Sequence, residues 1–345
     1  MKSDISSDQV ILATGSYDQT IRFWSPHNGQ CLRVVQHTDS QVNDMEITPD
    51  REFLAAAGFQ HIRLYDIRDN SNPNPVITCD SISKGVTAIG FQEDTKWMYS
   101  GGEDGFCRIW DFRARNFHAQ RTHQVGSPIN TCKLHPNQTE ICFGDQNGNI
   151  YVWDLRGSLK QTISVDDDVS IQHINIDPEG TCLAAVDNKG NCYMFSFTLN
   201  YVRLQCSPLQ PRLKFNAHKR YGLRCSFSPD STLLATTSAD QTCKVWRTAD
   251  LLPLSTHGSE DGGYSRSSNS IWHTFDNMSP VVELQTANQR WVWDLAFSAD
   301  SQYIITASSD NNARLWSINT GEVKKEYVGH QGPITALAFS DAFID

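Results

Sequence analysis

The sequence predicts an all-β fold, a seven-bladed β-propeller, and three observations support this prediction. An aromatic residue that closes a similar segment recurs along the 345 residues, and the first five such aromatics are 41 to 45 residues apart. The residues before each aromatic alternate between apolar and polar types, as they do in half-buried strands. The first unit has one strand too few and the last has one too many, which predicts a ring closed by the two chain ends.

Four strong copies of the repeat define its pattern. Each strong copy has an Asp six residues before a Trp: Asp18/Trp24, Asp104/Trp110, Asp240/Trp246 and Asp310/Trp316. Three weaker copies end at Tyr65, Trp153 and Phe195. Self-similarity at this period is the signature of repeat architectures, so we expect seven blades in one domain that spans residues 1–345.

Each unit is expected to contain four strands. In the sixth unit these begin with Leu223–Phe227, and Thr232–Thr236 and Thr242–Trp246 follow a Ser-Pro-Asp turn. A further strand follows the aromatic, as at Cys31–Val35 in the first unit. Four strands in each unit, with a Trp-Asp pair as at Trp110-Asp111, are typical of a WD-repeat propeller blade.

The strand count at the two ends predicts how the ring closes. The N-terminal segment begins on a second strand, Val10–Thr14, so the first blade lacks its first strand. After the seventh aromatic the chain supplies a fourth strand, Glu322–Val328, and then a spare one, Ile334–Ser340. We expect the spare strand to complete blade 1, which leaves no exposed sheet edge between first and last blade.

His, Asp and Trp side chains at fixed repeat positions favour a structural network over catalysis. Closure of the ring brings His330 to Asp18 and Trp24, and His218 has the same relation to Asp240 and Trp246. A hydroxyl from Thr14 or Ser16, and from Thr236 or Ser238, would link them, so that every buried polar group has a partner. In the other units the Asp position holds Phe59, Asn147 or Lys189, so the network is incomplete there and we expect those blades to rely more on apolar packing.

Composition and motifs exclude several classes of function. Lys plus Arg is 29 and Asp plus Glu is 39, a net charge of −10 that argues against binding nucleic acid or an anionic membrane. A membrane span, a signal peptide and a CxxC pair are all missing, which predicts a reducing cytoplasmic setting, no direct membrane insertion and no metal. Nucleotide-binding, hydrolase and zinc-protease motifs are missing too, so we expect no catalytic residues and no cofactor.

The remaining candidate site is a protein-binding surface at one end of the central channel. In propellers, the loop before the first strand and the residue before the turn Asp face this end. These positions are Tyr17, Gln41, Asn43, Glu103, Tyr221, Leu223, Trp291 and Trp293. Exposed aromatics in such a cluster are typical hot spots of protein interfaces. The alternative is that one or both tryptophans pack inward between blades.

One region interrupts the repeat. A Ser- and Gly-rich insertion at about 252–279 is expected to be a flexible loop, with the fourth strand of blade 6 resuming at Pro280–Gln285. An acidic run at Asp166–Asp168 lacks the spacing of a calcium loop and is expected to be solvated.

Beyond the generic repeat, several stretches resemble one family. VQHTDSQVNDMEITPDREFLAAAGFQHIRLYD, LHPNQTEICFGDQNGNIYVWDL and FSPDSTLLATTSADQTCKVWRT are similar to the small WD-repeat, G-protein-beta-subunit-like subunit of the target-of-rapamycin (TOR) kinase complexes. The resemblance covers essentially the whole chain and includes non-repeat features such as QVND and HPNQ. It implies a non-catalytic scaffold that binds and stabilises the TOR kinase domain in nutrient and growth signalling. The implied partners also include the raptor-type and rictor-type subunits, and the implied location is the cytoplasm, with recruitment to lysosomal or other endomembranes through partners.

Two alternatives from other classes stay open on the sequence. One is a substrate-receptor or other adaptor propeller, as in ubiquitin ligases, which usually carries an added helical segment. The other is an enzyme of propeller fold, which the missing motifs disfavour.

Overall fold

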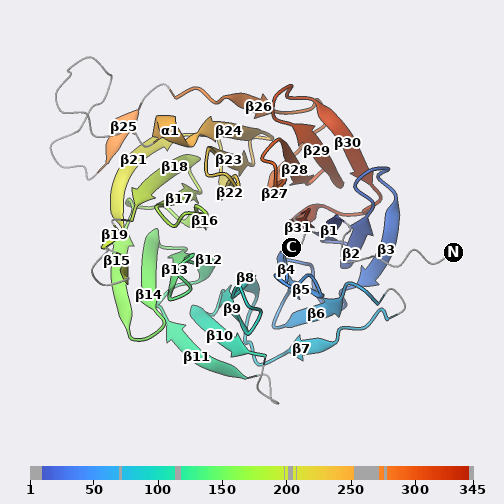
Figure 1. Cartoon of the computed structure of the whole chain (residues 1–345), viewed down its shortest axis with the longest axis horizontal. Coiled ribbons are helices and arrows are strands. Elements are labelled where there is room, and N and C mark those ends of the chain that lie inside the picture. The colour runs from blue at the N-terminus through green and yellow to red at the C-terminus, as the bar shows by residue number, and fades with distance from the viewer. Residues whose placement is uncertain are drawn as a thin grey trace.

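The computed structural model describes residues 10–69, 72–112, 118–197, 199–200, 205–206, 208–251, 272–275 and 278–341. Seven sheets, antiparallel except for one added strand in the fifth, stand around a central channel, each with its first strand innermost (Figure 1). The predicted seven-bladed propeller is therefore confirmed.

The strands of the first four blades follow the chain from the channel outward, apart from the innermost strand of blade 1. Blade 1 contains β31 (Ile334–Ser340), β1 (Ile11–Ser16), β2 (Thr20–Trp24) and β3 (Cys31–Gln36). Blade 2 contains β4 (Asp44–Ile47), β5 (Phe53–Ala57), β6 (Ile62–Asp66) and β7 (Ile77–Cys79). Blade 3 contains β8 (Val86–Phe91), β9 (Trp97–Gly102), β10 (Phe106–Asp111) and β11 (Ala119–Gln124). Blade 4 contains β12 (Ile129–Leu134), β13 (Glu140–Asp145), β14 (Asn149–Asp154) and β15 (Leu159–Ser164).

The other three blades carry the irregular elements. Blade 5 contains β16 (Ile171–Ile176), β17 (Cys182–Asp187), β18 (Asn191–Ser196), β21 (Gln210–Asn216) and β25 (His273–Phe275), and β19 (Leu199–Asn200) pairs separately with β20 (Gln205–Cys206). Blade 6 contains β22 (Gly222–Phe227), β23 (Leu233–Ser238), β24 (Cys243–Arg247) and β26 (Val282–Leu284), with the short helix α1 (Thr248–Leu251) after β24. Blade 7 contains β27 (Val292–Phe297), β28 (Tyr303–Ser308), β29 (Asn312–Ser317) and β30 (Val323–Val328).

The ring closes through blade 1, as the strand count predicts. Strand β31 pairs antiparallel with β1, with Thr14 opposite Leu337 and Ile11 opposite Ser340. Figure 1 shows β31 between β1 and the channel, beside the C-terminal end of the chain. The two ends of the described chain are therefore hydrogen-bonded into one sheet.

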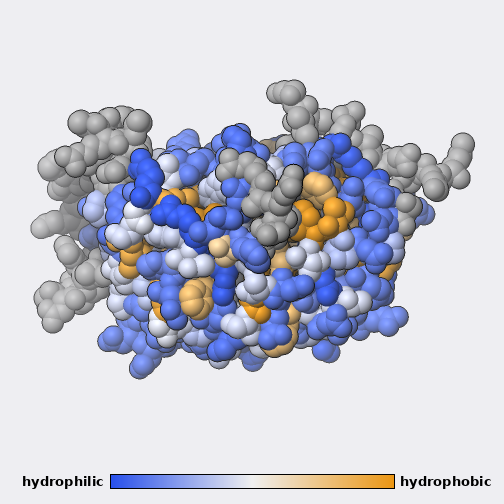
Figure 2. Space-filling model, turned by 90° about the horizontal axis from the view of Figure 1, so that it is seen from below, coloured by the Kyte–Doolittle hydropathy of each residue, from blue (hydrophilic) through white to orange (hydrophobic). Residues whose placement is uncertain are grey.

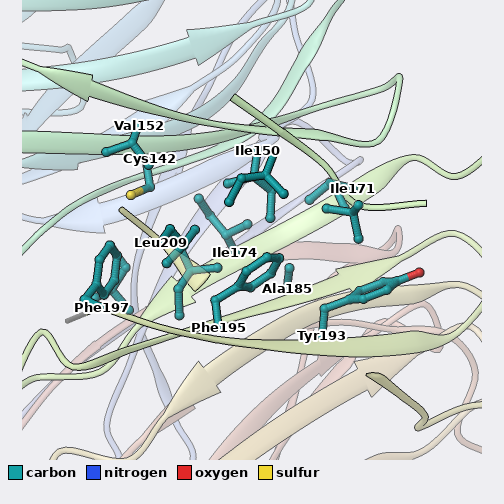
Figure 3. Close-up of a cluster of buried hydrophobic side chains, with 14 of the residues drawn as sticks. Cys142, Ile150, Val152, Ile171, Ile174, Ala185, Tyr193, Phe195, Phe197 and Leu209 are labelled. Atoms are coloured by element: carbon teal, nitrogen blue, oxygen red, sulfur yellow. The ribbon is translucent and has the colours of Figure 1, made fainter. Parts of the chain in front are cut away.

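The hydrophobic core lies between neighbouring blades. Because side chains of a strand alternate between its two faces, each blade packs one face against the blade before it and the other against the blade after it. Between blades 4 and 5 the buried cluster includes Cys142, Ile150, Val152, Ile171, Ile174, Ala185, Tyr193, Phe195, Phe197 and Leu209 (Figure 3). This continuous packing makes the ring a rigid support for its loops.

Strand β25 corrects the prediction for the insertion at 252–279. The described part, His273–Phe275, runs parallel to β21 as a fifth strand of blade 5, although the chain reaches it from blade 6. Trp272 is buried, its Nε1–H donates to the carbonyl of Val165 at 3.0 Å, and its ring centroid lies 5.0 Å from that of Tyr193. An apolar pocket on blade 5 thus binds the one Trp of a polar stretch. Residues 252–271 and 276–277 lie outside the described residues.

The outer rim is mostly hydrophilic on the side of blades 2 and 3. In Figure 2 apolar side chains appear there only in small, separate patches. Among the described residues, the structure contains no helix that is long and apolar enough to cross a membrane.

Candidate protein-binding face

The upper face is defined here as the end of the propeller with the turns between second and third strands, such as residues 17–19 and 103–105. A cavity of about 460 Å³ opens on this face around the channel mouth. Five of the eight predicted partner-binding residues line it: Tyr17, Gln41, Asn43, Glu103 and Trp293. They come from blades 1, 2, 3 and 7, so the fold brings together residues that are up to 276 positions apart in the sequence.

The two predicted tryptophans form one aromatic unit beside this cavity. Their ring centroids are 5.5 Å apart and their planes are tilted by 47°. Trp293 is partly buried, and its Nε1–H donates to Oγ of Ser309 at 2.6 Å, which holds the indole in place. Trp291 is 36% exposed. The tryptophans therefore lie at the surface, and neither is wholly packed between blades.

The three other predicted residues lie outside the cavity, and one residue that was not predicted lines it. Tyr221 is 48% exposed and Leu223 is half-buried on blade 6, and neither lines the cavity. Phe59 lines the cavity and is 53% exposed, although it was not among the predicted partner-binding residues. A large apolar residue in a turn that normally holds a polar one was the available signal.

Asn43 lies at the surface, but its side chain also links two blades. It directly precedes β4, and the residues at the equivalent position in four consecutive blades donate a side-chain hydrogen bond to a backbone carbonyl at the start of the next blade. These bonds are Thr335 to the carbonyl of Val42 (2.5 Å), Asn43 to Val86 (2.9 Å), Thr87 to Ile129 (2.6 Å) and Asn130 to Ile171 (2.8 Å). Asn43 thus ties blade 2 to blade 3, and its amide is already engaged.

The same position in blades 5, 6 and 7 holds Gln172, Leu223 and Trp293. None of these three side chains bonds to the following blade within the described part of the chain. Side chains at this one position therefore link blade 1 through to blade 5, whereas in blades 6 and 7 the position is apolar or aromatic.

At the next residue along the inner strands, acceptor side chains bind backbone N–H groups of the next blade. Asp44 accepts from Ile89, Thr131 from Ile174, His173 from Cys225 and Asp294 from Leu337. In blade 6 the same position holds Arg224, which cannot accept. Its guanidinium instead bridges Asp44 at 2.5 Å and Asp294 at 3.1 Å across the channel.

The structure shows the His–Asp–Trp arrangement in blades 1 and 6. In blade 1, Trp24 Nε1–H donates to Thr14 Oγ1 at 2.7 Å, Thr14 lies 2.7 Å from His330 Nε2, and His330 Nδ1 lies 2.9 Å from Asp18. Trp246, Thr236, His218 and Asp240 repeat it with distances of 3.0, 2.8 and 3.0 Å. Burial alone would raise the pKa of Asp18, but hydrogen bonds from Thr20, Gln331 and His330 lower it to about 2. Of the hydroxyls left open by the sequence, Thr14 and Thr236 make the link.

Blades 3 and 7 keep the Trp–hydroxyl bond and replace the His with an Arg. Trp110 donates to Ser100 at 2.9 Å and Trp316 to Thr306 at 2.9 Å. The turn carboxylates pair with an arginine four residues on, Asp104 with Arg108 and Asp310 with Arg314, each at 2.6 Å. These charges are paired inside the protein, as buried charges must be.

Blades 2, 4 and 5 lack the expected Asp but contain polar networks of other kinds. Asp145 accepts from Tyr151 at 3.0 Å and Asp187 accepts from Tyr193 at 2.8 Å, and each also binds backbone N–H groups of its turn. Both carboxylates stand two residues before the predicted Asp position, at the end of the second strand. The tyrosine hydroxyl, which the blade aromatics Trp and Phe lack, makes this second type of network possible.

Blade 2 uses two neutral histidines. His37 Nδ1 lies 3.1 Å from the hydroxyl of Tyr65, and His37 Nε2 lies 3.1 Å from Nε2 of His61. Burial, and to a smaller extent His61 and Arg63, lower the pKa of His37 to about 3. One imidazole must donate and the other must accept, so the bond between them is lost when both rings are protonated.

Acidification should therefore destabilise the protein through blade 2. The unfolded His37 has a pKa of about 6.5 and binds a proton that the folded state excludes, so stability present at pH 7 is lost as the pH falls from 6.5 towards 3. At pH 5.5 this single residue costs on the order of 1 kcal/mol. A His37→Gln variant, which does not titrate, should show a flatter dependence of Tm on pH between 7 and 5.5. The exposed His27 is the matched control, and equal slopes for wild type and His37→Gln would contradict the assignment.

The remaining polar candidates have structural partners. Cys107, Cys192 and Cys243 are fully buried, and burial raises the pKa of each thiol, to about 12 for Cys107 and Cys243. Asp166 of the acidic run forms an ion pair with Lys214. No group of three or more His, Cys, Asp or Glu side chains in the described part of the chain could hold a metal ion.

Family comparisons agree with the repeat. Residues 3–25, 209–247 and 279–317 match the family "WD domain, G-beta repeat", and residues 59–206 match "Nucleolar protein 10-like, N-terminal domain". Together with the seven blades and the Trp–hydroxyl networks, these matches define the class: the chain is a WD-repeat β-propeller.

Full-length relatives narrow the class to a family. The chain is 50% identical to "Target of rapamycin complex subunit LST8" of Bos taurus over 343 residues, which is 99% of this chain and 98% of that protein. It is 44% identical to "Protein LST8 homolog" of Drosophila melanogaster over 97% of this chain and 98% of that protein. It is 40% identical to the LST8 subunit of Saccharomyces cerevisiae over 72% of this chain and 80% of that protein. The chain belongs to the LST8 family, which confirms the resemblance described above.

Proposed function

We propose that this chain is a non-catalytic subunit of TOR kinase complexes that binds and stabilises the kinase domain of the TOR serine/threonine kinase. The observation that carries the proposal is the 50% identity over nearly the full length to a protein named as a TOR complex subunit. In the proposal the raptor-type and rictor-type subunits belong to the same complexes. The chain works in the cytoplasm and reaches lysosomal or other endomembranes through these partners.

The upper face is the proposed contact surface. It combines a cavity, an exposed aromatic pair and a rigid ring beneath, and a preorganised surface of this kind loses little conformational entropy on binding. Aromatic side chains at the centre of an interface contribute a large part of its binding free energy.

A double variant, Trp291→Ala with Trp293→Ala, tests this surface. We expect its affinity for purified TOR kinase to fall by at least about 30-fold, because two aromatic hot-spot residues are lost. The matched control is Tyr303→Ala, which removes an aromatic of similar exposure (38%) from the opposite end of strand β28. Biolayer interferometry measures the affinity, and thermal unfolding shows whether each variant is folded.

Affinity purification with mass spectrometry tests the wider proposal. Recovery of a TOR kinase with the wild-type chain supports it, whereas recovery of cullin components without TOR would favour the ubiquitin-ligase alternative. A folded double variant that still co-purifies fully with TOR would show that the contact lies elsewhere.

A further inference from the structure

The cavity on the upper face has an unusual lining. Among its eleven residues are three aromatics, Tyr17, Phe59 and Trp293, and two carboxylates, Asp39 and Glu103. Within the described part of the chain, no Lys, Arg or His lines the cavity. A cavity that combines aromatic rings with acidic groups, and whose described lining residues include no cation, is suited to a positively charged guest.

The two carboxylates are available to such a guest. Glu103 is exposed and forms no ion pair with any other described residue. Its carboxylate lies against the backbone of Gly85, about 3.0 Å from the position that a Cβ there would take, so the absence of a side chain at residue 85 leaves room for it. Asp39 pairs with Arg63 at 3.4 Å, but its side chain is 79% exposed, and an exposed pair of this kind is weak and easily exchanged.

The aromatic walls are partly fixed and partly open. The bond of Trp293 to Ser309 and its contact with Trp291 hold that ring in place. Tyr17 and Phe59 are 46% and 53% exposed, so their faces can receive a ligand. The face of each ring carries the negative part of its quadrupole, which attracts cations.

The size and surroundings favour a side-chain cation over a metal ion. A cavity of about 460 Å³ is far larger than a bare ion needs, and its apolar walls suit the alkyl stem of a long side chain. A divalent ion would need converging oxygen ligands, and no such group exists among the described residues. The net charge of −10 adds a long-range attraction for a basic segment.

We propose that this cavity binds a lysine or arginine side chain of a partner protein, held by Glu103 and by the rings of Tyr17, Phe59 and Trp293. The inference rests on the proposed function only in taking the TOR kinase as the partner that supplies the side chain. The cavity then acts as a specificity pocket at the channel mouth, while the Trp291/Trp293 pair supplies apolar contact beside it.

The first test uses small cations and needs no partner. The probes are N-ethylguanidinium and n-butylammonium, with n-butanol as the neutral analogue, and the readout is ¹⁹F NMR of the protein labelled with 5-fluorotryptophan, with the Trp293 resonance assigned from Trp293→Phe. We expect the cations to shift the Trp293 resonance saturably, n-butanol to have little effect, and Glu103→Gln to weaken the apparent affinity about three- to tenfold. The matched control Glu93→Gln, an exposed Glu at the opposite end of strand β9, should leave it unchanged. No saturable shift, or an equal response in Glu103→Gln, would overturn the proposal.

The second test uses the purified TOR kinase and separates the two ideas. Glu103→Gln should weaken kinase binding and reduce its dependence on salt, whereas Glu93→Gln should do neither. If the wild-type chain does not bind the kinase at all, the proposed function fails while the result with the small cations still stands. If the kinase binds and Glu103→Gln binds equally well at every salt concentration, the cation pocket is refuted and the proposed function survives.

Discussion

A chain that ends at Gly332 should fail to form a stable propeller. The truncation keeps His330 and removes only strand β31, the inner strand of blade 1. It deletes the buried side chains of Ile334, Ala336, Leu337 and Ala338, breaks the whole ladder with β1, and exposes the edge of that strand. Because the usual total stability is only about 5–15 kcal/mol, losing a whole strand with its buried side chains and its ladder should leave no stable fold. Circular dichroism and thermal unfolding should show no cooperative transition.

The control for this truncation is a chain that ends at Asp341, which keeps all of β31. It should unfold at the temperature of the full chain. A synthetic peptide of residues 333–341 added to the short chain should restore part of the fold, because the open edge of β1 is a template for one strand. A short chain that unfolds cooperatively at the full chain's Tm would show that blade 1 does not depend on this closure.

Closure of the ring could be predicted from the sequence because it follows from the number of strands in the first and last units. The polar networks of blades 4 and 5 could not be predicted, because they depend on which side chains meet in three dimensions. The spare strand Ile334–Ser340 was evident as a period-two segment beyond the last unit. In blades 4 and 5, by contrast, Asp145 and Asp187 lie outside the consensus position, and their partners are tyrosines on the next strand. Spacing alone does not show that such a hydroxyl reaches the carboxylate of the preceding strand.

The candidate site was likewise predictable in the positions of its residues but not in their contacts. Register within a repeat places Tyr17, Gln41, Glu103 and Trp293 at the channel mouth, and the structure brings them to one cavity. Register does not reveal which of these side chains are already engaged, as Asn43 is with the carbonyl of Val86. It also does not reveal that Trp272, outside any repeat, is buried against blade 5. Such contacts depend on the three-dimensional neighbour and not on the local pattern.

The second large effect is expected from Arg224. Its guanidinium joins Asp44 of blade 2 to Asp294 of blade 7, and its side chain and the two carboxylates are only 15%, 6% and 7% exposed. Replacement by Met keeps the apolar stem and leaves two buried carboxylates without their counter-charge. Removing one partner of a buried ion pair costs about 3–5 kcal/mol, so Arg224→Met should lower stability by that amount at pH 7.5. Arg156→Met, which removes an exposed arginine from its pair with Asp154, is the control and should cost less than about 1 kcal/mol.

The pH dependence of the Arg224→Met variant separates charge from packing. Burial raises the pKa of Asp294 to about 6 even though Arg224 lowers it, so loss of the arginine should raise this pKa further. A carboxyl whose folded pKa exceeds its unfolded value of about 3.9 costs stability as the pH rises through that window, because the folded state must give up a proton that it holds tightly. The destabilisation by Arg224→Met, measured by urea unfolding, should therefore be smaller at pH 5 than at pH 7.5. Adding Asp294→Asn should recover stability at pH 7.5, since the amide carries no charge. A penalty that is the same at both pH values and is not relieved by Asp294→Asn would mean that Arg224 acts through packing and not through its charge.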